Sequence, residues 1–423
     1  MIERVARIFK VKELRNKIFF ILAILVIFRL AANVPIPGVD SSQLKSFFEG
    51  NQLLGLMDMF SGGGLRNISI VMLGVGPYIT ASIVMQLMTM IFPRLEQLYK
   101  EEGQAGREKF NMWTRYITVP FAMLQAFGMI SLFRSQQVLT ELTVFNYVTI
   151  IITATAGTIF LMWLGELISE KGIGNGVSFL IFAGIVSALP TSIHQLIATW
   201  DPTQVLTYLS FAALAIVTII GIIIVNEGQR NIPISFARRI RGGKTTGGTK
   251  TQLPLRVNQA GVIPIIFAMS IMIFPGVVAN FFAASSNQAI AGVAGTIADL
   301  FANQAFYSFI YFVLVVLFTY FYTAVTFDPK NVAENLQRQG GFVPGIRPGV
   351  PTMEYLNHIT NRITLSGAIF LGLVAILPFI VQGITGIRAL SIGGTSILIV
   401  VSVVLESMKQ IEAQLVMRDY EGF

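Results

Sequence analysis

Few residues in this chain carry the side chains that enzymes use, and their pattern argues against catalysis. The chain has no cysteine and only two histidines, His194 and His358, which lie far apart in the sequence. A thiolate metal site is therefore excluded, and a histidine-based metal centre is not expected. The motifs GxSxG, HExxH and GxxxxGK[ST] are absent. We expect no catalytic residue, no metal and no cofactor.

Charged side chains are also scarce in the apolar runs. Arg29 and Glu406 lie near the ends of such runs, where long side chains reach the interface, and Glu166 and Glu170 lie at an inner end. An ion-coupled transporter usually needs an ionisable group near the bilayer midplane, and this sequence places none there. The pattern favours a passive pathway over its rivals, a secondary transporter with a polar midplane site or an intramembrane enzyme with a catalytic pair.

Two pairs of isoleucines have the spacing of one helix face. Ile79 and Ile83 are four residues apart, and so are Ile181 and Ile185. An apolar constriction can gate a pore by dewetting. Isoleucine pairs are also common in ordinary membrane helices, so the spacing alone leaves both interpretations open.

Two groups of basic residues lie in long polar segments. Arg238, Arg239 and Arg241 crowd together in one segment, and Arg347 lies in the sequence GGFVPGIRPGVP in the other. A turn rich in Pro and Gly fixes the direction of its side chains. Such a charged surface suits docking to an acidic protein or to RNA. The alternative is that the basic residues only mark the cytoplasmic side of a membrane.

The first isoleucine pair belongs to a broken apolar span, Phe60–Pro93. Three glycines open it, a half-helix is predicted over Leu65–Leu73, and the stretch Gly74–Pro77 interrupts the chain before the main helix. The half-helix would be about 14 Å long, too short to cross ~30 Å of hydrocarbon. The break must therefore be buried in protein or line a cavity. A re-entrant surface loop or a kinked ordinary span remains the alternative.

The overall composition is that of a polytopic, all-α membrane protein. Of 423 residues, 54% are hydrophobic and 12% are charged. Apolar runs of the length that a bilayer helix needs predict ten transmembrane helices. They cover residues 18–34, 68–92, 113–133, 145–165, 177–198, 204–225, 259–282, 306–326, 363–382 and 391–408. The first run lacks a small-residue cleavage site, so we expect it to be retained.

The basic residues predict the orientation. With a cytoplasmic N-terminus, 25 of the 30 Lys and Arg residues fall on the cytoplasmic side and four outside, as the positive-inside rule requires. Ten spans then place the C-terminus in the cytoplasm as well. The chain divides near residue 200 into two five-span halves, 1–200 and 201–423, with long cytoplasmic loops at 226–258 and 327–361. Interrupted spans at matching positions are typical of inverted repeats with a pathway between them.

Seven segments, taken in order, resemble the SecY/Sec61-alpha family, the central subunits of the Sec protein-conducting channel. They are FSGGGLRNISI, GVGPYITASIVMQL, EEGQAGREKFNMWTRY, GELISEKGIGNGVSFLIFAGIV, LPLRVNQAGVIPIIFA, GGFVPGIRPG and GGTSILIVVSVVLE. The resemblance covers nearly the whole chain. It implies a clamshell of two inverted halves around a pore, with a re-entrant plug half-helix at about 63–73.

The resemblance also implies roles for individual residues. A pore ring is implied for Ile79, Ile83, Ile181, Ile185, Ile266 and Ile399, and a plug for Gly63, Gly64, Leu65, Arg66, Asn67, Ile68, Ser69 and Ile70. A lateral gate to lipid is implied between spans 2 and 3 on one side and 7 and 8 on the other, with Gln86 and Asn258 as its polar residues. Docking of SecA and the ribosome is implied for Arg347, Arg238, Arg239 and Arg241.

As a family member, the chain is expected to act as a passive channel. It would translocate unfolded secretory polypeptides with signal sequences and release membrane helices sideways into lipid. The implied partners are SecE, a SecG-like subunit, the motor ATPase SecA, the ribosome and the preprotein itself. The implied location is the bacterial cytoplasmic membrane.

Overall fold

A computed structural model gives the arrangement of the chain. It describes residues 11–36, 58, 61–65, 67–100, 102–135, 143–198, 202–236, 239–241, 244–246, 250–283, 288–385 and 394–421. Two predicted site residues, Arg66 in the plug and Arg238 in the basic loop, lie outside these ranges. For Arg239 and Arg241 the backbone alone is described.

A helix occupies each of the ten ranges predicted to span the membrane. These helices are α2 (Lys12–Ala31), α5 (Gly76–Ile91), α7 (Gly103–Ser135), α8 (Val144–Lys171), α9 (Gly176–Ala198), α10 (Val205–Glu227), α11 (Ile263–Ala283), α13 (Gln304–Thr326), α15 (Val350–Thr385) and α16 (Gly394–Glu421). Among the described residues, five are long and apolar enough to cross a membrane, and a bent pair makes a sixth. The count of ten spans therefore stays a prediction.

Within the described ranges, three further α-helices and a short 3-10 helix, η1 (Pro202–Gln204), were not predicted. The three α-helices are α6 (Pro93–Lys100), α12 (Gln288–Ala302) and α14 (Pro329–Arg338). The chain bends by 114° between α5 and α6, because Pro93 cannot continue the hydrogen bonds of the preceding helix. Helix α14 has a local start signal, since the Asp328 carboxylate accepts hydrogen bonds from the amides of Lys330 (3.0 Å) and Asn331 (3.4 Å).

The described residues of the segment 61–75, which are 61–65 and 67–75, do not form the half-helix that the sequence predicted. Several of its amides bond to carbonyls three residues earlier, as Ile68 does to Leu65 (3.1 Å), and the segment is a run of turns. The backbone angle φ is positive at Gly62 (69°), Gly74 (59°) and the β-branched Ile68 (41°). Left-handed torsions interrupt a right-handed helix. The segment that was predicted to be a plug is thus a run of turns over its described residues, and its role stays a prediction.

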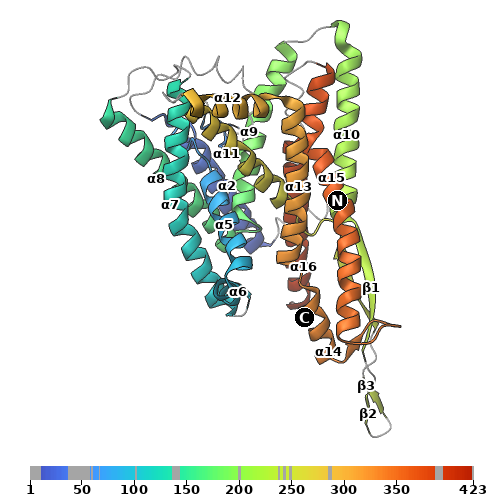
Figure 1. Cartoon of the computed structure of the whole chain (residues 1–423). Helices are drawn as coiled ribbons and strands as arrows, with labels where there is room; N and C mark the ends of the chain where they lie inside the picture. The colour runs from blue at the N-terminus through green and yellow to red at the C-terminus, as the bar shows by residue number, and fades with distance from the viewer. Residues whose placement is uncertain are drawn as a thin grey trace.

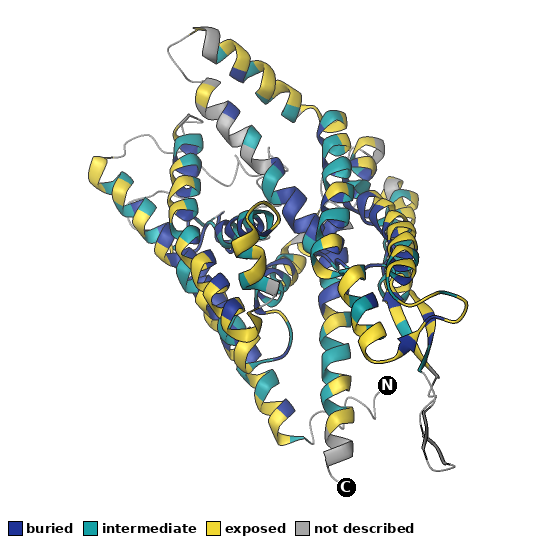
Figure 2. Ribbon diagram, turned by 60° about the horizontal axis from the view of Figure 1, so that its bottom comes forward, coloured by how far each residue is buried: buried dark blue, intermediate teal, exposed yellow. Residues whose placement is uncertain are grey.

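The core lies where the helices meet, and apolar side chains also cover the outside of the molecule. Figure 2 shows buried residues gathered at the centre and exposed ones along the outer helix faces. On α10, Val217 and Ile224 are large, apolar and exposed. Such faces are what a helix presents to lipid.

The two long loops predicted to be cytoplasmic are joined in one sheet. Strand β1 (Gln229–Phe236) pairs antiparallel with β4 (Lys250–Arg256) and with the short β5 (Gly341–Phe342). Beyond β1, the strands β2 (Arg239–Arg241) and β3 (Lys244–Thr246) form a hairpin that extends away from the helices (Figure 1). The sequence analysis did not predict this sheet.

The sheet has a small core of its own. Ile232 of β1 and Leu255 of β4 pack with Val343, which follows β5, and with Leu356 and Ile359 of α15. Helix α15 has 36 residues and is about 54 Å long. That length exceeds the hydrocarbon thickness, so its first turns belong to the sheet and its later turns to the helix bundle.

Candidate functional site

The six isoleucines of the predicted ring all belong to one large buried apolar cluster, and their arrangement as a ring stays a prediction. None is more than 7% exposed, and all belong to the same buried apolar cluster. They are Ile79 and Ile83 on α5, Ile181 and Ile185 on α9, Ile266 on α11 and Ile399 on α16. This cluster therefore contains residues from both halves of the sequence. We call these six the isoleucine collar.

The collar residues lie on helices that are extensively buried. On α5 Ile79 and Ile83 share one face, and the buried residues Pro77, Ala81, Met85 and Thr89 lie on the other side of the helix. On α16, Leu398 and Ile399 are fully buried. Burial on α5 is therefore not confined to the face that carries the two isoleucines.

The turn segment 61–75 packs against the collar cluster on one side. Val71 and Val75 belong to the same cluster as the six isoleucines. Leu65, Ile68 and Met72 belong instead to a second cluster, which also contains residues of α7 and α8. The segment therefore contributes buried residues to both clusters, the second of which also contains residues of α7 and α8.

Specific contacts hold the turn segment. The Ile36 amide donates to the Ile68 carbonyl (2.9 Å), and the Ile70 amide donates to the Val34 carbonyl (3.0 Å). The Arg29 guanidinium donates to the carbonyl of Gly62. From the sequence, Arg29 was predicted only to lie near the membrane interface. In the structure its guanidinium also holds the glycine turn.

One glycine allows α8 to approach the turn segment closely. A Cβ atom added at Gly157 would lie 1.8 Å from the carbonyl oxygen of Ile70, which is backbone and cannot rotate away. By contrast, a Cβ added at Gly295 on α12 meets nothing within 4 Å. Both glycines lie in helices, but only Gly295 has room for an added Cβ atom.

We expect Gly157→Ala to destabilise the protein, because backbone atoms must move to admit the methyl group. Overpacking of this kind costs about 1–3 kcal/mol. Gly295→Ala should be neutral or stabilise by up to about 1 kcal/mol, the ordinary helix gain of alanine over glycine. Thermal unfolding of the purified variants measures both. Equal melting temperatures would contradict close packing between α8 and the segment.

The two predicted gate residues differ in their hydrogen bonds: Gln86 bonds within its own helix, and Asn258 bonds to another helix. The Gln86 side chain donates to Ser82 on its own helix (3.3 Å). Asn258 precedes α11 and donates to Asn226 of α10 (2.7 Å), which donates in turn to Ser402 of α16 (2.7 Å). These bonds tie the start of α11 to α10 and α16. A gate role for Gln86 and Asn258 remains a prediction.

Asn226 and Ser402 were missed by the sequence analysis. Each is a single polar residue at the end of, or within, an apolar run: IIIVNE for Asn226 and LIVVSVVLE for Ser402. Because isolated polar residues in membrane helices usually find a partner, that signal was available. The identity of the partner could not be read from the sequence, since Asn226 and Ser402 are 176 positions apart.

Arg347 is exposed on a turn with a defined backbone. The flanking Gly345 and Gly349 have positive φ angles of 87° and 97°. The Thr352 hydroxyl donates to the Arg347 carbonyl (2.8 Å), and the Ile346 amide donates to the Val343 carbonyl (3.0 Å). The predicted rigid turn is therefore present, with its arginine directed to the surface.

Comparison with known proteins gives the family. The SecY family model matches residues 69–408. Over 441 aligned residues, the chain is 42% identical to the protein translocase subunit SecY of Streptomyces coelicolor, with 100% of both chains covered. It is 41% identical to the Mycobacterium tuberculosis subunit, with 97% of each chain covered.

Solved structures share the fold. A protein-conducting channel matches with a TM-score of 0.62 at 18% identity, covering 94% of this chain and 91% of that one. Sec61 in a canine ribosome–channel complex from the endoplasmic reticulum matches with a TM-score of 0.59 at 17% identity, with 94% and 91% covered. With the sequence matches, these likenesses establish that the chain belongs to the SecY family.

Proposed function

We propose that this chain forms the pore of a protein translocase and conducts unfolded polypeptides across a membrane. The observation that carries the proposal is the isoleucine collar, six buried side chains from four helices beside a compact turn segment. A translocating chain has no fixed sequence, so specific polar contacts would trap it. An apolar collar avoids such contacts and resists ions while it is narrow.

In this proposal the segment 61–75 is the plug of the resting channel. The burial of its residues in the cluster that contains the collar and in the cluster of α7 and α8 supports that role. The residues concerned include Gly63, Gly64, Leu65, Asn67, Ile68, Ser69 and Ile70, with Arg66 between them in sequence. Opening would require the segment to leave the collar.

The two halves of the chain, 1–200 and 201–423, would part to open a lateral gate. A signal sequence is an apolar helix, so burial in lipid favours its sideways release. Gln86 and Asn258 would face this opening. Each has a buried side-chain oxygen without a partner among the described residues, Oε1 and Oδ1 respectively, and such acceptors could bond new groups in an open state.

Partners would supply the energy and the targeting. We place the channel in the bacterial cytoplasmic membrane with both termini in the cytoplasm, and we assign SecE and a SecG-like subunit as its companions. SecA and the ribosome would dock on Arg347 and on the basic hairpin that carries Arg238, Arg239 and Arg241. The positive charge of both elements supports that assignment.

Crosslinking tests the conducting path directly. The chain has no cysteine, so a single Ile83→Cys variant has no background thiols. We expect this cysteine to crosslink to a stalled secretory polypeptide that carries one cysteine, and to do so only when the polypeptide has a signal sequence. Ile150→Cys is the control, because Ile150 is equally buried but belongs to the second cluster.

A secondary transporter, the rival class, predicts a different result. Ile83→Cys would then give no polypeptide adduct, and reconstituted vesicles would take up a small solute in a saturable manner. Crosslinks of equal yield at positions 83 and 150 would also show that the collar does not line the conducting path.

A further inference from the structure

Helix α12 lies beside the membrane spans without being one of them. It has 15 residues and is about 22 Å long, too short to cross ~30 Å of hydrocarbon. A single residue, Asn303, joins it to α13, and Figure 1 shows α12 lying across the end of α13 rather than continuing it. Neither the collar nor the plug segment explains this helix.

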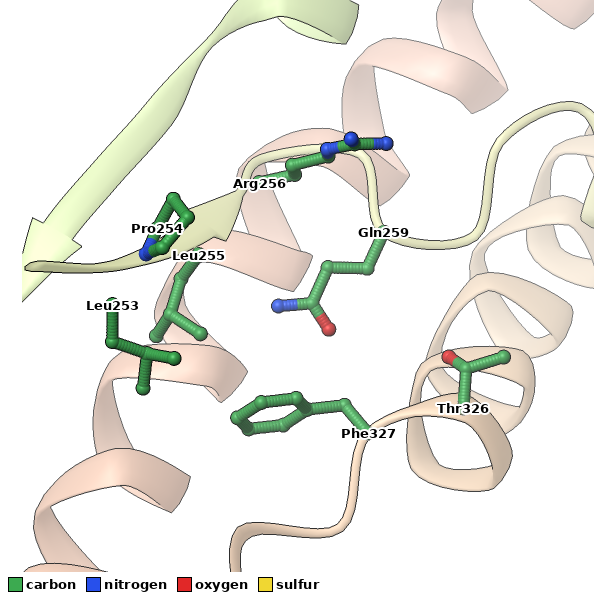
Figure 3. Close-up of a pocket in the computed structure, with 7 residues that line it drawn as sticks. All are labelled: Leu253, Pro254, Leu255, Arg256, Gln259, Thr326 and Phe327. Carbon is green, nitrogen blue, oxygen red and sulfur yellow. The ribbon is translucent and has the colours of Figure 1, made fainter. Parts of the chain in front are cut away.

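The other end of α13 shows on which side of the membrane α12 lies. Thr326 and Phe327, where α13 ends, line the same small pocket as strand β4 of the sheet (Figure 3). The helix that begins at Gln304 is long and apolar enough to cross a membrane. Its first turn, and with it α12, is therefore on the opposite side of the membrane from the sheet.

The junction between α12 and α13 is held by specific contacts. The Asn303 side chain accepts hydrogen bonds from the amides of Ala305 (3.0 Å) and Phe306 (3.3 Å). The Phe306 ring packs edge to face with the ring of Phe301 on α12, with their centroids 5.7 Å apart. These contacts keep α12 at the depth in the membrane at which α13 begins.

The surface of α12 has three different sides. Because successive residues of a helix are about 100° apart, Val293, Ile297 and Leu300 fall within about 60° of one another. All three are large, apolar and exposed, at 65%, 38% and 46%. The adjacent side is also exposed but has no large apolar residue. It carries Gln288, Gly292, Thr296 and Asp299. The third side carries the buried Ala294, and α12 packs against α11.

A position in the plane of the membrane interface suits all three sides. Water would be unfavourable for the apolar side, and hydrocarbon would be unfavourable for the polar side. An interfacial helix places its apolar side against the acyl chains and its polar side in water. The exposed apolar residues also continue along the chain into α13, where Phe309 is 65% exposed on a membrane span.

The charge of α12 indicates which part of a lipid it contacts. Asp299 is the only ionisable residue between Gln288 and Ala302, so the helix has no Lys or Arg. Interfacial helices that depend on anionic lipids carry Lys and Arg on their polar side. The contact should therefore rest on acyl chains and not on headgroup charge.

We propose that α12 is an interfacial helix whose apolar side, Val293, Ile297 and Leu300, binds lipid acyl chains in the leaflet far from the sheet. Zwitterionic lipid is sufficient for this contact. The helix thereby anchors the first turn of α13 at the membrane surface. This surface goes beyond the proposed channel function, because none of its residues belongs to the collar or to the plug segment.

Spin labels on single cysteines test the proposal, since the chain has no cysteine of its own. Ile297→Cys places a nitroxide on the apolar side, and Asp299→Cys places one about 160° away around the same helix. The full-length protein is placed in phosphatidylcholine vesicles. Power-saturation EPR then measures collisions with oxygen, which dissolves in lipid, and with the water-soluble complex nickel ethylenediaminediacetate. We expect nickel collisions roughly tenfold fewer at position 297 than at position 299, and more oxygen collisions at 297.

A second pair of positions makes the test independent of any one variant. Leu300→Cys should behave like Ile297→Cys, and Thr296→Cys should behave like Asp299→Cys. Val217→Cys on the exposed face of α10 gives the lipid reference, and Gln252→Cys on β4 gives the water reference. Adding phosphatidylglycerol to the vesicles should leave the contrast between the two sides unchanged. Thermal unfolding confirms that each labelled variant is folded.

Three results would overturn the proposal. Equal nickel collisions at positions 297 and 299 would place the whole helix in water. Few collisions with either reagent at both 297 and 300 would show that protein covers this side, either another segment of the chain or a second copy. A contrast that appears only with phosphatidylglycerol would show that headgroup charge, and not acyl-chain contact, holds the helix at the membrane.

Discussion

Replacing Ile83 with asparagine should make vesicles that contain the protein leaky to ions. Ile83 is buried in the collar cluster, where an amide side chain would hold water in a place that is otherwise apolar. An unpaired polar group changes the free energy of such an apolar site by roughly 1–3 kcal/mol. We take this range as the change in the barrier to ion passage. That range corresponds to an increase in conductance of about five- to 150-fold. Ile266→Asn, from the other half of the chain, should have the same effect.

A matched variant separates the collar from the core in general. Ile222 on α10 is as deeply buried as Ile83 and belongs to the same cluster, but it is not one of the six collar residues. Ile222→Asn should lower thermal stability without a comparable leak. If all three asparagine variants leak equally, or if none leaks, the collar does not seal a pore.

Arg347→Glu should abolish motor-driven translocation and leave the protein folded. The turn is held by its backbone, through Gly345, Gly349 and the Thr352 hydroxyl, so the arginine side chain is free to serve a partner. Reversing a charge that pairs with a partner weakens docking by about 2–5 kcal/mol, or roughly 30- to 5,000-fold. SecA-driven import of a preprotein into vesicles measures the effect.

Arg338→Glu is the control for charge alone. Arg338 lies nearby on α14, is exposed, and pairs only weakly with Glu334 at 3.5 Å. The Arg338→Glu variant should therefore retain nearly normal translocation. Normal import by Arg347→Glu, or an equal loss in both variants, would remove Arg347 from the docking surface.

The sequence predicted helices well where apolar length alone decides the structure. Each of the ten apolar runs corresponds to a helix, because a membrane span must satisfy its backbone internally. The burial of Ile79, Ile83, Ile181 and Ile185 follows from their four-residue spacing together with the family resemblance. Spacing alone could not separate a collar from ordinary packing.

The failures share a physical cause. The half-helix over Leu65–Leu73 was predicted from apolar content, but Ile68 adopts a left-handed torsion that its side chain disfavours. Bonds from Ile36 and to Val34 support that conformation, and they come from a different part of the chain. The β1–β5 pairing likewise joins residues about 100 positions apart, and local patterns do not encode such distant partners.

The pairing of β5 with β1 joins two loops that are distant in the sequence, so the two loops should move together. Ser235 lies opposite Phe342, so the base of the hairpin and the base of the Arg347 turn share backbone hydrogen bonds. A force applied by a partner to the hairpin tip would therefore reach Arg347 without crossing the bilayer. Changes that shorten or twist the hairpin should then be compensated by second-site changes near residues 341–345, although the two regions never adjoin in sequence.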